Sequence, residues 1–394
     1  MKKKNLRSKE WFDNPNDPGL TALYLERYLN YGLKKEDLQS GKPIIGIAQS
    51  GSDLSPCNRH FQVLSKTIKD GIREAGGVPM EFPTHPIQET GKRPTAALDR
   101  NLSYLSLVEV LYGYPIDGVI LTTGCDKTTP AALMAAATVN IPSIVLSGGP
   151  MLDGSYKGKK AGSGTIIWEA RKLHAKGEIN YDEFMDMAAA SAPSIGHCNT
   201  MGTASSMNSI AEALGMSLTG GAIIPAPYKE RETISFETGK RIVEMVHEDL
   251  TPSKIMTKEA FENAIYVASA IGASSNCPPH LTAIARHMGI DLSIDSWEKL
   301  GHDIPLLVNC QPAGEYLMEG FFKAGGIPAI MQELMKNNKL HKNVMTVTGK
   351  TVEENLNIKI NINESVVKSF KSPLVENAGF IVMKSNFFSS AVMK

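Results

Sequence analysis

The hydrophobic residues between positions 43 and 150 alternate between short apolar runs and amphipathic segments. The amphipathic segments predict helices at 64–72, 102–111 and 130–139, the last opened by Pro130 at a position that suits proline. The apolar runs are rich in β-branched residues, which predicts buried strands at 44–48, 78–82, 118–121 and 144–146. Strands that alternate with helices of this length indicate crossover units. We therefore expect an α/β fold whose parallel sheet has helices on both faces.

The pattern changes on either side of this region. Residues 1–42 are polar with scattered aromatic side chains, and they predict an arm with one short helix near 20–33. Residues 203–310 are richer in helix. Helices are expected there at 205–214, 261–271 and 281–288, followed by a late strand at 304–308.

Beyond about residue 340 the chain becomes strand-like. Segments at 344–348, 358–362 and 379–383 predict the beginning of a β-rich, barrel-like second domain. The expected divisions are therefore an arm at 1–42, an α/β domain at 43–340 and a partial domain at 341–394. A β segment of about fifty residues is marginal alone. We expect that it leans on the first domain or on a partner, or that the chain is incomplete.

Charge and composition exclude several classes of protein. Lysine plus arginine and aspartate plus glutamate both number 41, so the basic excess of a nucleic-acid binder is absent. The basic start Met1–Lys4 is followed by polar residues, which argues against a secretion signal. The apolar region 131–146 is interrupted by Thr138, Asn140 and Pro142, so it does not predict a membrane span. We expect a cytoplasmic globular protein with neither a nucleic-acid nor a membrane partner.

Three of the five cysteines occupy similar positions. Cys57 and Cys125 follow predicted strands, Cys198 lies in a Gly/Ser/Thr loop, and each precedes a predicted helix. Ligands of open α/β sheets bind beyond the carboxyl ends of the strands, and a helix dipole there favours the thiolate form. No Cys-x-x-Cys pair is present. An odd, sparse set of this kind indicates neither a disulfide framework nor a zinc ribbon.

Three converging thiolates suit a soft metal or an iron–sulfur cluster. Electron-transfer [2Fe–2S] clusters usually take four cysteines, so three would leave one iron open to act as a Lewis acid. Zinc with three cysteine ligands is a competing interpretation, and buried thiols without a ligand are another. Glu89 and Asp126 lie in loops at the same predicted edge, and their hard oxygen atoms suit magnesium.

Five stretches of the sequence resemble the dihydroxy-acid and phosphogluconate dehydratase family, and particularly its sugar-acid branch of arabinonate and xylonate dehydratases. The two most specific are a Cys-Asp-Lys loop and a second, glycine-rich cysteine loop. The matching stretches are Ser-Pro-Cys-Asn-Arg-His (55–60), Thr-Gly-Cys-Asp-Lys-Thr-Thr-Pro (123–130), Ser-Gly-Gly-Pro-Met (147–151), Gly-His-Cys-Asn-Thr-Met-Gly-Thr-Ala (196–204) and Asn-Cys-Pro-Pro-His-Leu-Thr-Ala-Ile-Ala (276–285).

The resemblance implies two cofactors and a reaction. It implies a [2Fe–2S] cluster held by Cys57, Cys125 and Cys198 with one open iron, and Mg²⁺ near Glu89, Asp126 and Lys127, the lysine being carbamylated. The implied reaction removes water from a polyhydroxy acid, a 2,3-dihydroxy sugar acid, to give a 2-keto-3-deoxy acid. A homodimer or homotetramer is also implied. Cys277 and Cys310 match no cluster position and are expected to be structural.

In the family, a serine of the second domain removes the C2 proton. Its counterpart would lie beyond Lys394, so the resemblance implies the cofactor-binding part of a C-terminally truncated dehydratase. Residues 384–391 depart from the Gly-Asn-Leu-Ala-Pro form of the dihydroxy-acid branch, and Ser385 stands where a glycine is usual. The alternatives are a weak or inactive cluster-binding remnant, a dihydroxy-acid dehydratase of branched-chain amino-acid synthesis, and a zinc-stabilised α/β binding protein.

Overall fold

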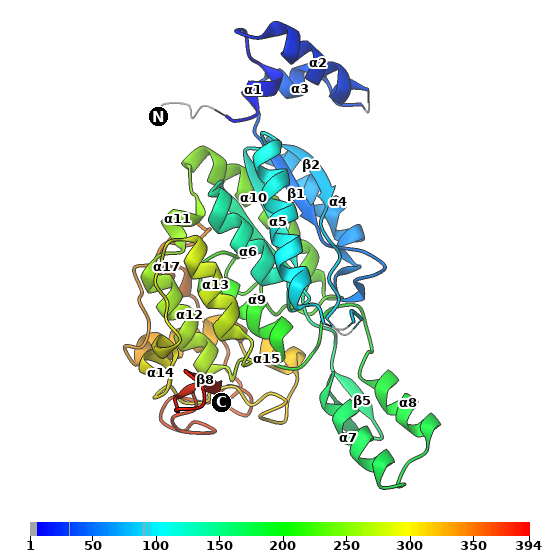
Figure 1. Cartoon of the computed structure of the whole chain (residues 1–394), viewed down its shortest axis with the longest axis vertical. Coiled ribbons are helices and arrows are strands. Elements are labelled where there is room, and N and C mark those ends of the chain that lie inside the picture. Colours follow the sequence, from blue (N-terminus) through cyan, green and yellow to red (C-terminus); the bar gives the residue numbers. More distant parts are fainter. Residues whose placement is uncertain (1–5, 31, 90, 94) are drawn as a thin grey trace.

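A computed structural model of the chain describes residues 6–30, 32–89, 91–93 and 95–394 (Figure 1). Its central element is a four-stranded parallel sheet with the strand order β2-β1-β3-β4. The strands are β1 (Ile44–Gln49), β2 (Val78–Pro83), β3 (Gly118–Thr123) and β4 (Ser143–Ser147). All four predicted strands are confirmed, each one or two residues longer than expected. Every residue of β1, β3 and β4 is buried, as their continuous apolar runs indicated.

The direction in which strands are added reverses at β1. The chain steps from β1 to β2 on one side and then returns to place β3 on the other side. Right-handed crossovers therefore put α4 (Phe61–Glu74) on one face and α5 (Ala97–Gly113) and α6 (Thr128–Val139) on the opposite face. Helix α10 (Lys229–Glu248) packs beside α4. Helices thus cover both faces, and the carboxyl ends of β1 and β3 meet at the topological switch point.

Helix α6 begins two residues before the predicted start at Pro130. The hydroxyl of Thr128 accepts a hydrogen bond from the Gly124 backbone N–H (3.1 Å) and donates one to the Cys125 carbonyl (2.7 Å), which turns the chain into the helix. Pro130 then occupies the third helical position, where a missing N–H leaves no bond unmade. The helix is buried on almost every side, which explains its alanine-rich sequence.

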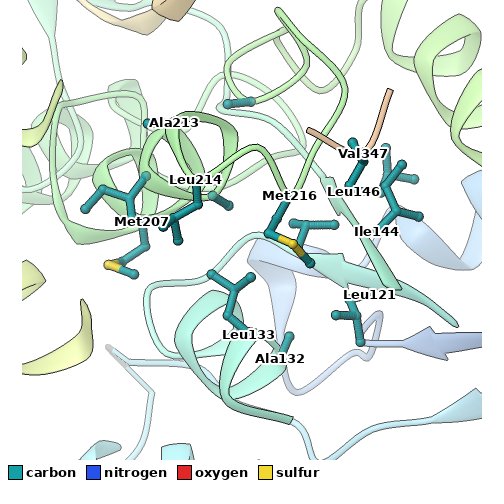
Figure 2. Packing of buried hydrophobic residues seen from close by; sticks show 14 of the residues in the cluster. Leu121, Ala132, Leu133, Ile144, Leu146, Met207, Ala213, Leu214, Met216 and Val347 are labelled. Carbon is teal, nitrogen blue, oxygen red and sulfur yellow. The ribbon is translucent and has the colours of Figure 1, made fainter. Parts of the chain in front are cut away.

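The core is continuous from the sheet into the helices that follow it. Leu121 of β3, Leu133 of α6 and Met207 of α9 (Thr203–Ala213) belong to one cluster that extends from Leu6 to Phe380. Figure 2 shows Met216 between the α6 side chains and those of the sheet. The backbone supports this contact, since the Val145 N–H of β4 donates to the Met216 carbonyl (2.8 Å).

The second half of the chain is mostly helical, and its predicted helices at 205–214, 261–271 and 281–288 are confirmed with shifted ends. They correspond to α9, to α12 (Lys258–Ala270) and to α13 (Cys277–His287). The shorter helices around them are α11 (Pro252–Ile255), α14 (Asp295–Gly301), α15 (Met318–Lys323), α16 (Gly326–Lys336) and α17 (Val352–Leu356).

The N-terminal arm has three helices where one was predicted. They are α1 (Lys9–Phe12), α2 (Pro18–Leu29) and α3 (Lys35–Gln39). The helix predicted near 20–33 begins earlier, at Pro18. The reason is that the Asp17 side chain accepts a hydrogen bond from the Leu20 N–H (3.0 Å) and so caps the helix. Tyr31, within the predicted range, lies outside the described residues. The Arg7 guanidinium ties the arm to the sheet through the Leu111 and Ile116 carbonyls (both 3.1 Å).

The strands predicted at 304–308, 344–348 and 358–362 were wrong. In the segment 304–308, Leu307 and Val308 are buried, which accounts for its apolar sequence. The Leu307 N–H donates to the Ala270 carbonyl of α12 (2.8 Å). Its residues make only isolated bridges to Val367 and Val375. The short apolar run at 304–308 therefore indicates burial but not a strand. The segment at 379–383 does contain β7 (Ile381–Met383), which pairs with β8 (Ala391–Met393) in an antiparallel sheet. The domain boundaries stay predictions.

A small excursion between β4 and α9 was not anticipated. It consists of the hairpin β5 (Gly154–Tyr156) and β6 (Lys159–Ala161) with helices α7 (Thr165–Ala175) and α8 (Tyr181–Ala190). Figure 1 shows it projecting from the body, and it has a separate small core around Ile166, Ala170 and Met187. Within the described residues, no helix is long and apolar enough to cross a membrane.

The crossing of α4 and α10 yields a stability prediction. A Cβ atom on Gly71 would clash with the Phe236 carbonyl, and one on Gly239 would clash with the Ile68 carbonyl. We expect Gly239→Ala to force the helices apart and to lower the free energy of unfolding by about 3 kcal/mol. Urea denaturation followed by circular dichroism measures the loss. Gly113→Ala is the control, since no atom lies within 4 Å of its added carbon. Equal stability of the two variants would contradict the tight crossing.

Candidate functional site

The three cysteines singled out in the sequence come together beyond the carboxyl ends of β1 and β3. Cys57 lies in the short helix η1 (Pro56–Asn58) after β1, Cys125 follows β3, and Cys198 lies in the loop that leads to α9. The side chains of Cys57 and Cys125 share a hydrogen bond, and Cys198 interacts electrostatically with both. Cys277 and Cys310 are buried on α13 and in the loop before α15.

The pKa values of these thiols differ from the expectation that helix dipoles would lower all three. The hydrogen bond from Cys125 lowers the pKa of Cys57, and the same bond raises the pKa of Cys125. Burial raises the pKa of Cys198 to about 11. The pKa of Cys125 is raised by its bond to Cys57 and then by burial, and that of Cys198 mainly by burial, because loss of water disfavours the charged thiolate. Of the two bonded thiols, Cys57 therefore loses its proton more readily than Cys125.

Asn58 joins the first cysteine loop to the second. Its side-chain carbonyl accepts a hydrogen bond from the Cys125 backbone N–H (2.9 Å), and its amide group donates to the Ser50 hydroxyl (3.0 Å). The carboxamide is fully buried. A Cβ atom at position 124 would clash with its carbonyl oxygen, which explains the glycine before Cys125. Because Asn58 is next to Cys57, these bonds fix the two thiols relative to one another.

Asn208 joins the second loop to the helix that follows the third. It extends from α9, and its amide group donates to the Gly124 carbonyl (3.1 Å). Its own carbonyl accepts bonds from the hydroxyls of Thr123 (2.9 Å) and Thr129 (3.1 Å). This side chain is also buried. Two carboxamides thus hold the Cys125 loop from opposite sides.

The Cys198 loop is held by the Ser147–Met151 turn after β4. The His197 N–H donates to the Gly149 carbonyl (3.0 Å), and the Met151 N–H donates back to the His197 carbonyl (2.9 Å). On its other side the turn is held by the buried Arg231, which donates to the Ser147 carbonyl (2.5 Å) and to the Ile224 carbonyl. The third thiol therefore has a fixed position although its loop is irregular.

Glu89, Asp126 and Lys127 form a charged cluster beside the thiols. The Lys127 ammonium lies 2.9 Å from a Glu89 carboxylate oxygen and 3.4 Å from Asp126, and it is almost wholly buried. Burial raises the pKa of Asp126 to about 6, against the opposing pull of Lys127. Burial alone would lower the pKa of Lys127, but the two carboxylates outweigh it, so the net shift is upward. The structure thus brings all three sequence-predicted oxygen-ligand candidates together.

The donor atoms fit the groups expected from the sequence by their chemistry. As the side chains stand, no group of three or more His, Cys, Asp or Glu residues in the described part of the chain is placed to hold a metal ion. Instead, the thiols of Cys57 and Cys125 bond to one another, and the carboxylates of Glu89 and Asp126 pair with the Lys127 ammonium. Soft sulfur donors on one side and hard oxygen donors on the other are nevertheless the sets that suit an iron–sulfur cluster and Mg²⁺.

Some residues at the site were not singled out in the sequence. Gln88 donates to the Cys57 sulfur (3.5 Å), and its position next to Glu89 was the available signal. Asn58 lies inside the stretch 55–60 that carried the resemblance, but its role depends on a contact with Cys125, 67 positions away. His280 of α13 lies 3.1 Å from the Arg100 guanidinium. Burial lowers the pKa of His280, and the charges of Arg100 and Lys127 lower it further. The fold, and not the local sequence, places His280 beside these two residues.

Comparison with known proteins defines the class. Residues 42–355 match the family described as dihydroxy-acid/6-phosphogluconate dehydratase, N-terminal, and the chain belongs to this family. It is 59% identical to the D-xylonate dehydratase of Caulobacter vibrioides over 99% of the chain and 66% of that protein. It is 45% identical to the L-arabinonate dehydratase of Rhizobium leguminosarum, over 100% of the chain and 69% of that protein. For the dihydroxy-acid dehydratase of Halothermothrix orenii, the identity is 37% over 91% of the chain and 66% of that protein. The chain spans about two thirds of the length of these relatives.

The Asn208 carboxamide yields a prediction about the site. Asn208→Asp replaces the donor that faces the Gly124 carbonyl with an acceptor, so two oxygens confront each other in a buried position. We expect a loss of about 2–4 kcal/mol in the free energy of unfolding, because a buried acceptor is left unsatisfied. Urea denaturation measures it. Asn361→Asp, at an exposed position outside the helices and strands, is the matched control. If Asn208→Asp were as stable as this control, Asn208 would not hold the Cys125 loop.

Proposed function

We propose that this chain is the cofactor-binding part of a sugar-acid dehydratase. The reaction is the removal of water from an aldonate, a 2,3-dihydroxy acid, to give a 2-keto-3-deoxy acid. The observation that carries this proposal is the meeting of three cysteine loops with the half-buried Glu89 and the buried Lys127 and Asp126 at the switch point of the sheet. Sequence identity supports the sugar-acid branch over the dihydroxy-acid branch. It is 59% and 45% to the D-xylonate and L-arabinonate dehydratases, and 37% to the dihydroxy-acid dehydratase.

In this proposal Cys57, Cys125 and Cys198 hold a [2Fe–2S] cluster, and Glu89, Asp126 and Lys127 hold Mg²⁺. When bound, these groups supply Lewis acidity toward the substrate's hydroxyl and carboxylate oxygens. The buried carboxamides of Asn58 and Asn208 keep the cysteine loops in register before any ligand arrives. Preorganisation of this kind lowers the cost of assembling the site.

Charge explains why a lysine can take part in a cation site. Glu89, Asp126 and an ammonium at Lys127 have formal charges of −1, −1 and +1, a sum of −1. Carbamylation would turn the lysine into an anion and make the sum −3, which a buried site tolerates only beside a cation. Modified Lys127 would then be an oxygen ligand between two carboxylates. We therefore propose that carbamylation of Lys127 and Mg²⁺ binding accompany each other.

The residues of this chain bind and orient, and we propose that the base comes from elsewhere. By family resemblance, a serine outside residues 1–394 takes the C2 proton. Without a general base, proton abstraction slows typically by ~10²–10⁴-fold. We also propose a reducing, cytoplasmic setting, which the five free cysteines support. The second candidate is a non-catalytic cluster-binding protein, because the residues assigned above bind and orient and none of them is assigned to take the C2 proton.

The ligand assignment predicts different outcomes for two classes of cysteine. Cys125→Ala or Cys198→Ala is expected to remove the visible absorption of the cluster while far-ultraviolet circular dichroism stays unchanged. Cys277→Ala is the control, because Cys277 is buried on α13 and does not belong to the proposed ligand set. A complete cluster spectrum in either of the first two variants would contradict the assignment.

The oxygen ligands are tested separately. Asp126→Asn removes a negative charge from the cluster at Lys127, so we expect Mg²⁺ affinity to fall more than tenfold with the visible spectrum retained. Titration calorimetry measures the affinity. Asp53→Asn, an exposed change near the Cys57 loop, serves as the control. Unchanged Mg²⁺ binding by Asp126→Asn would remove Asp126 from the site.

The reaction itself is tested by turnover of the anaerobically purified chain. We expect a 2-keto-3-deoxy product from D-xylonate or L-arabinonate, formed faster than the product of a branched-chain 2,3-dihydroxy acid. The rate should lie ~10²–10⁴-fold below that of a relative that includes the base. A folded, cluster-loaded chain that converts none of these acids would instead support the non-catalytic remnant.

A further inference from the structure

His280 of α13 has a buried ring nitrogen whose hydrogen-bonding capacity is unused. The side chain is only 5% exposed, and its Nε2 atom makes no hydrogen bond among the described residues. Its Nδ1 atom lies 3.1 Å from the Arg100 guanidinium. A guanidinium can only donate, so Nδ1 is the acceptor and the ring proton is on Nε2. The unused atom is therefore an N–H donor.

The environment of His280 keeps its imidazole neutral. Burial lowers the pKa of His280 to about 3, and the positive charges of Arg100 and Lys127 lower it further. A neutral ring keeps both the Nδ1 lone pair that faces Arg100 and the single proton on Nε2. Because an unpaired buried donor costs free energy, we expect the Nε2–H to meet an acceptor that the described residues do not supply as they stand.

The first turn of α13 lies beside the proposed cation site. Cys277, the first residue of this helix, interacts electrostatically with Asp126, and His280 interacts with Lys127. Lys127 directly precedes α6, which packs against both α5 and α13 (Figure 1). Arg100 is in the first turn of α5. The amino-terminal turns of three helices therefore meet near Lys127, and helix amino termini favour negative charge.

A carbamate on Lys127 is an acceptor that suits this donor. Carbamylation joins Nζ to the carbon of CO₂ with loss of one N–H proton to water, and it creates two acceptor oxygen atoms. If one oxygen binds Mg²⁺, the other needs a hydrogen-bond donor, because both are shielded from water. The unmodified ammonium has no acceptor, which explains why the Nε2–H of His280 is unpaired beside it.

Arg100 strengthens this donor from the other side of the ring. Among the described residues, its guanidinium contacts the Asn101 side chain and the His280 ring and makes no ion pair with a carboxylate. Hydrogen bonds in a chain polarise one another, so a cation at Nδ1 makes the Nε2–H a better donor to an anion. The sequence of contacts from Arg100 through His280 therefore favours negative charge at Lys127.

We propose that His280 donates a hydrogen bond from Nε2 to a carbamate oxygen on Lys127, with Arg100 fixing the orientation and tautomer of the ring. His280 is then a positioning residue: it holds the modified lysine and does not contact the reacting atoms. Partners of this kind orient metal ligands and tune the affinity of the site. The inference rests on the proposed function, since it needs the carbamylated lysine.

The bicarbonate dependence of carbamylation tests the contact. With ¹³C-labelled bicarbonate and Mg²⁺ at fixed pH, the carbamate carbon of the anaerobically purified chain is measured by NMR, and Lys127→Arg should abolish its signal. We expect His280→Leu, which removes the donor, to raise the half-saturating bicarbonate concentration at least ~10-fold. His280→Gln should recover most of this loss, because its amide group can donate in place of Nε2. His247→Leu, an exposed change on α10, is the control.

The outcomes separate this inference from the proposed function. A wild-type carbamate signal whose bicarbonate dependence is unchanged in His280→Leu would overturn the contact and leave the dehydratase assignment intact. A loss that His280→Gln does not recover would indicate packing alone and also overturn it. If circular dichroism shows His280→Leu to be unfolded, Arg100→Met takes its place, with a smaller rise expected and an unchanged value contradicting the proposal. A wild-type chain without carbamate would overturn this inference and the modification of Lys127 together, whereas the visible spectrum tests the cluster independently.

Discussion

Two buried carboxamides hold together the part of this protein where its chemistry is concentrated. Asn58 binds the Cys125 backbone from the loop of the first cysteine, and Asn208 binds the adjacent Gly124 carbonyl from the helix after the third. A carboxamide both donates and accepts, so each joins one loop to other polar groups without an unpaired atom. In a buried position such bonds are strong, and the loss of one partner is costly. The geometry of the first two cysteine loops, and their position relative to α9, thus depends on two side chains.

The carboxamides can act only because the sheet brings their loops together. Strand order reverses at β1, so the loops after β1 and β3 diverge to opposite faces and leave the switch point between them. The Ser147–Met151 turn after β4 adds the third loop through its bonds to His197. Burial then sets the electrostatics. It raises the pKa of Cys198 and of Asp126, and it makes Lys127 depend on two carboxylates for its charge.

The sequence was sufficient for the sheet and it indicated six candidate ligands, but it did not indicate the contacts that hold their loops together. Continuous apolar runs identified β1, β3 and β4 because strands buried on both faces have no polar alternation. The same signal failed at 304–308, where Leu307 is buried against α12 without forming a strand. Asn58 and Asn208 went unrecognised because their partners are distant in sequence.

The central claim is that the three cysteine loops form one cluster site. The most direct test is the number of iron, acid-labile sulfide and zinc atoms per chain after purification without oxygen, together with a visible spectrum. The account predicts about two irons and two sulfides with charge-transfer absorption and no zinc. Stoichiometric zinc, or a folded chain free of iron and sulfide, would contradict it, and the family relationship would then describe ancestry without the chemistry.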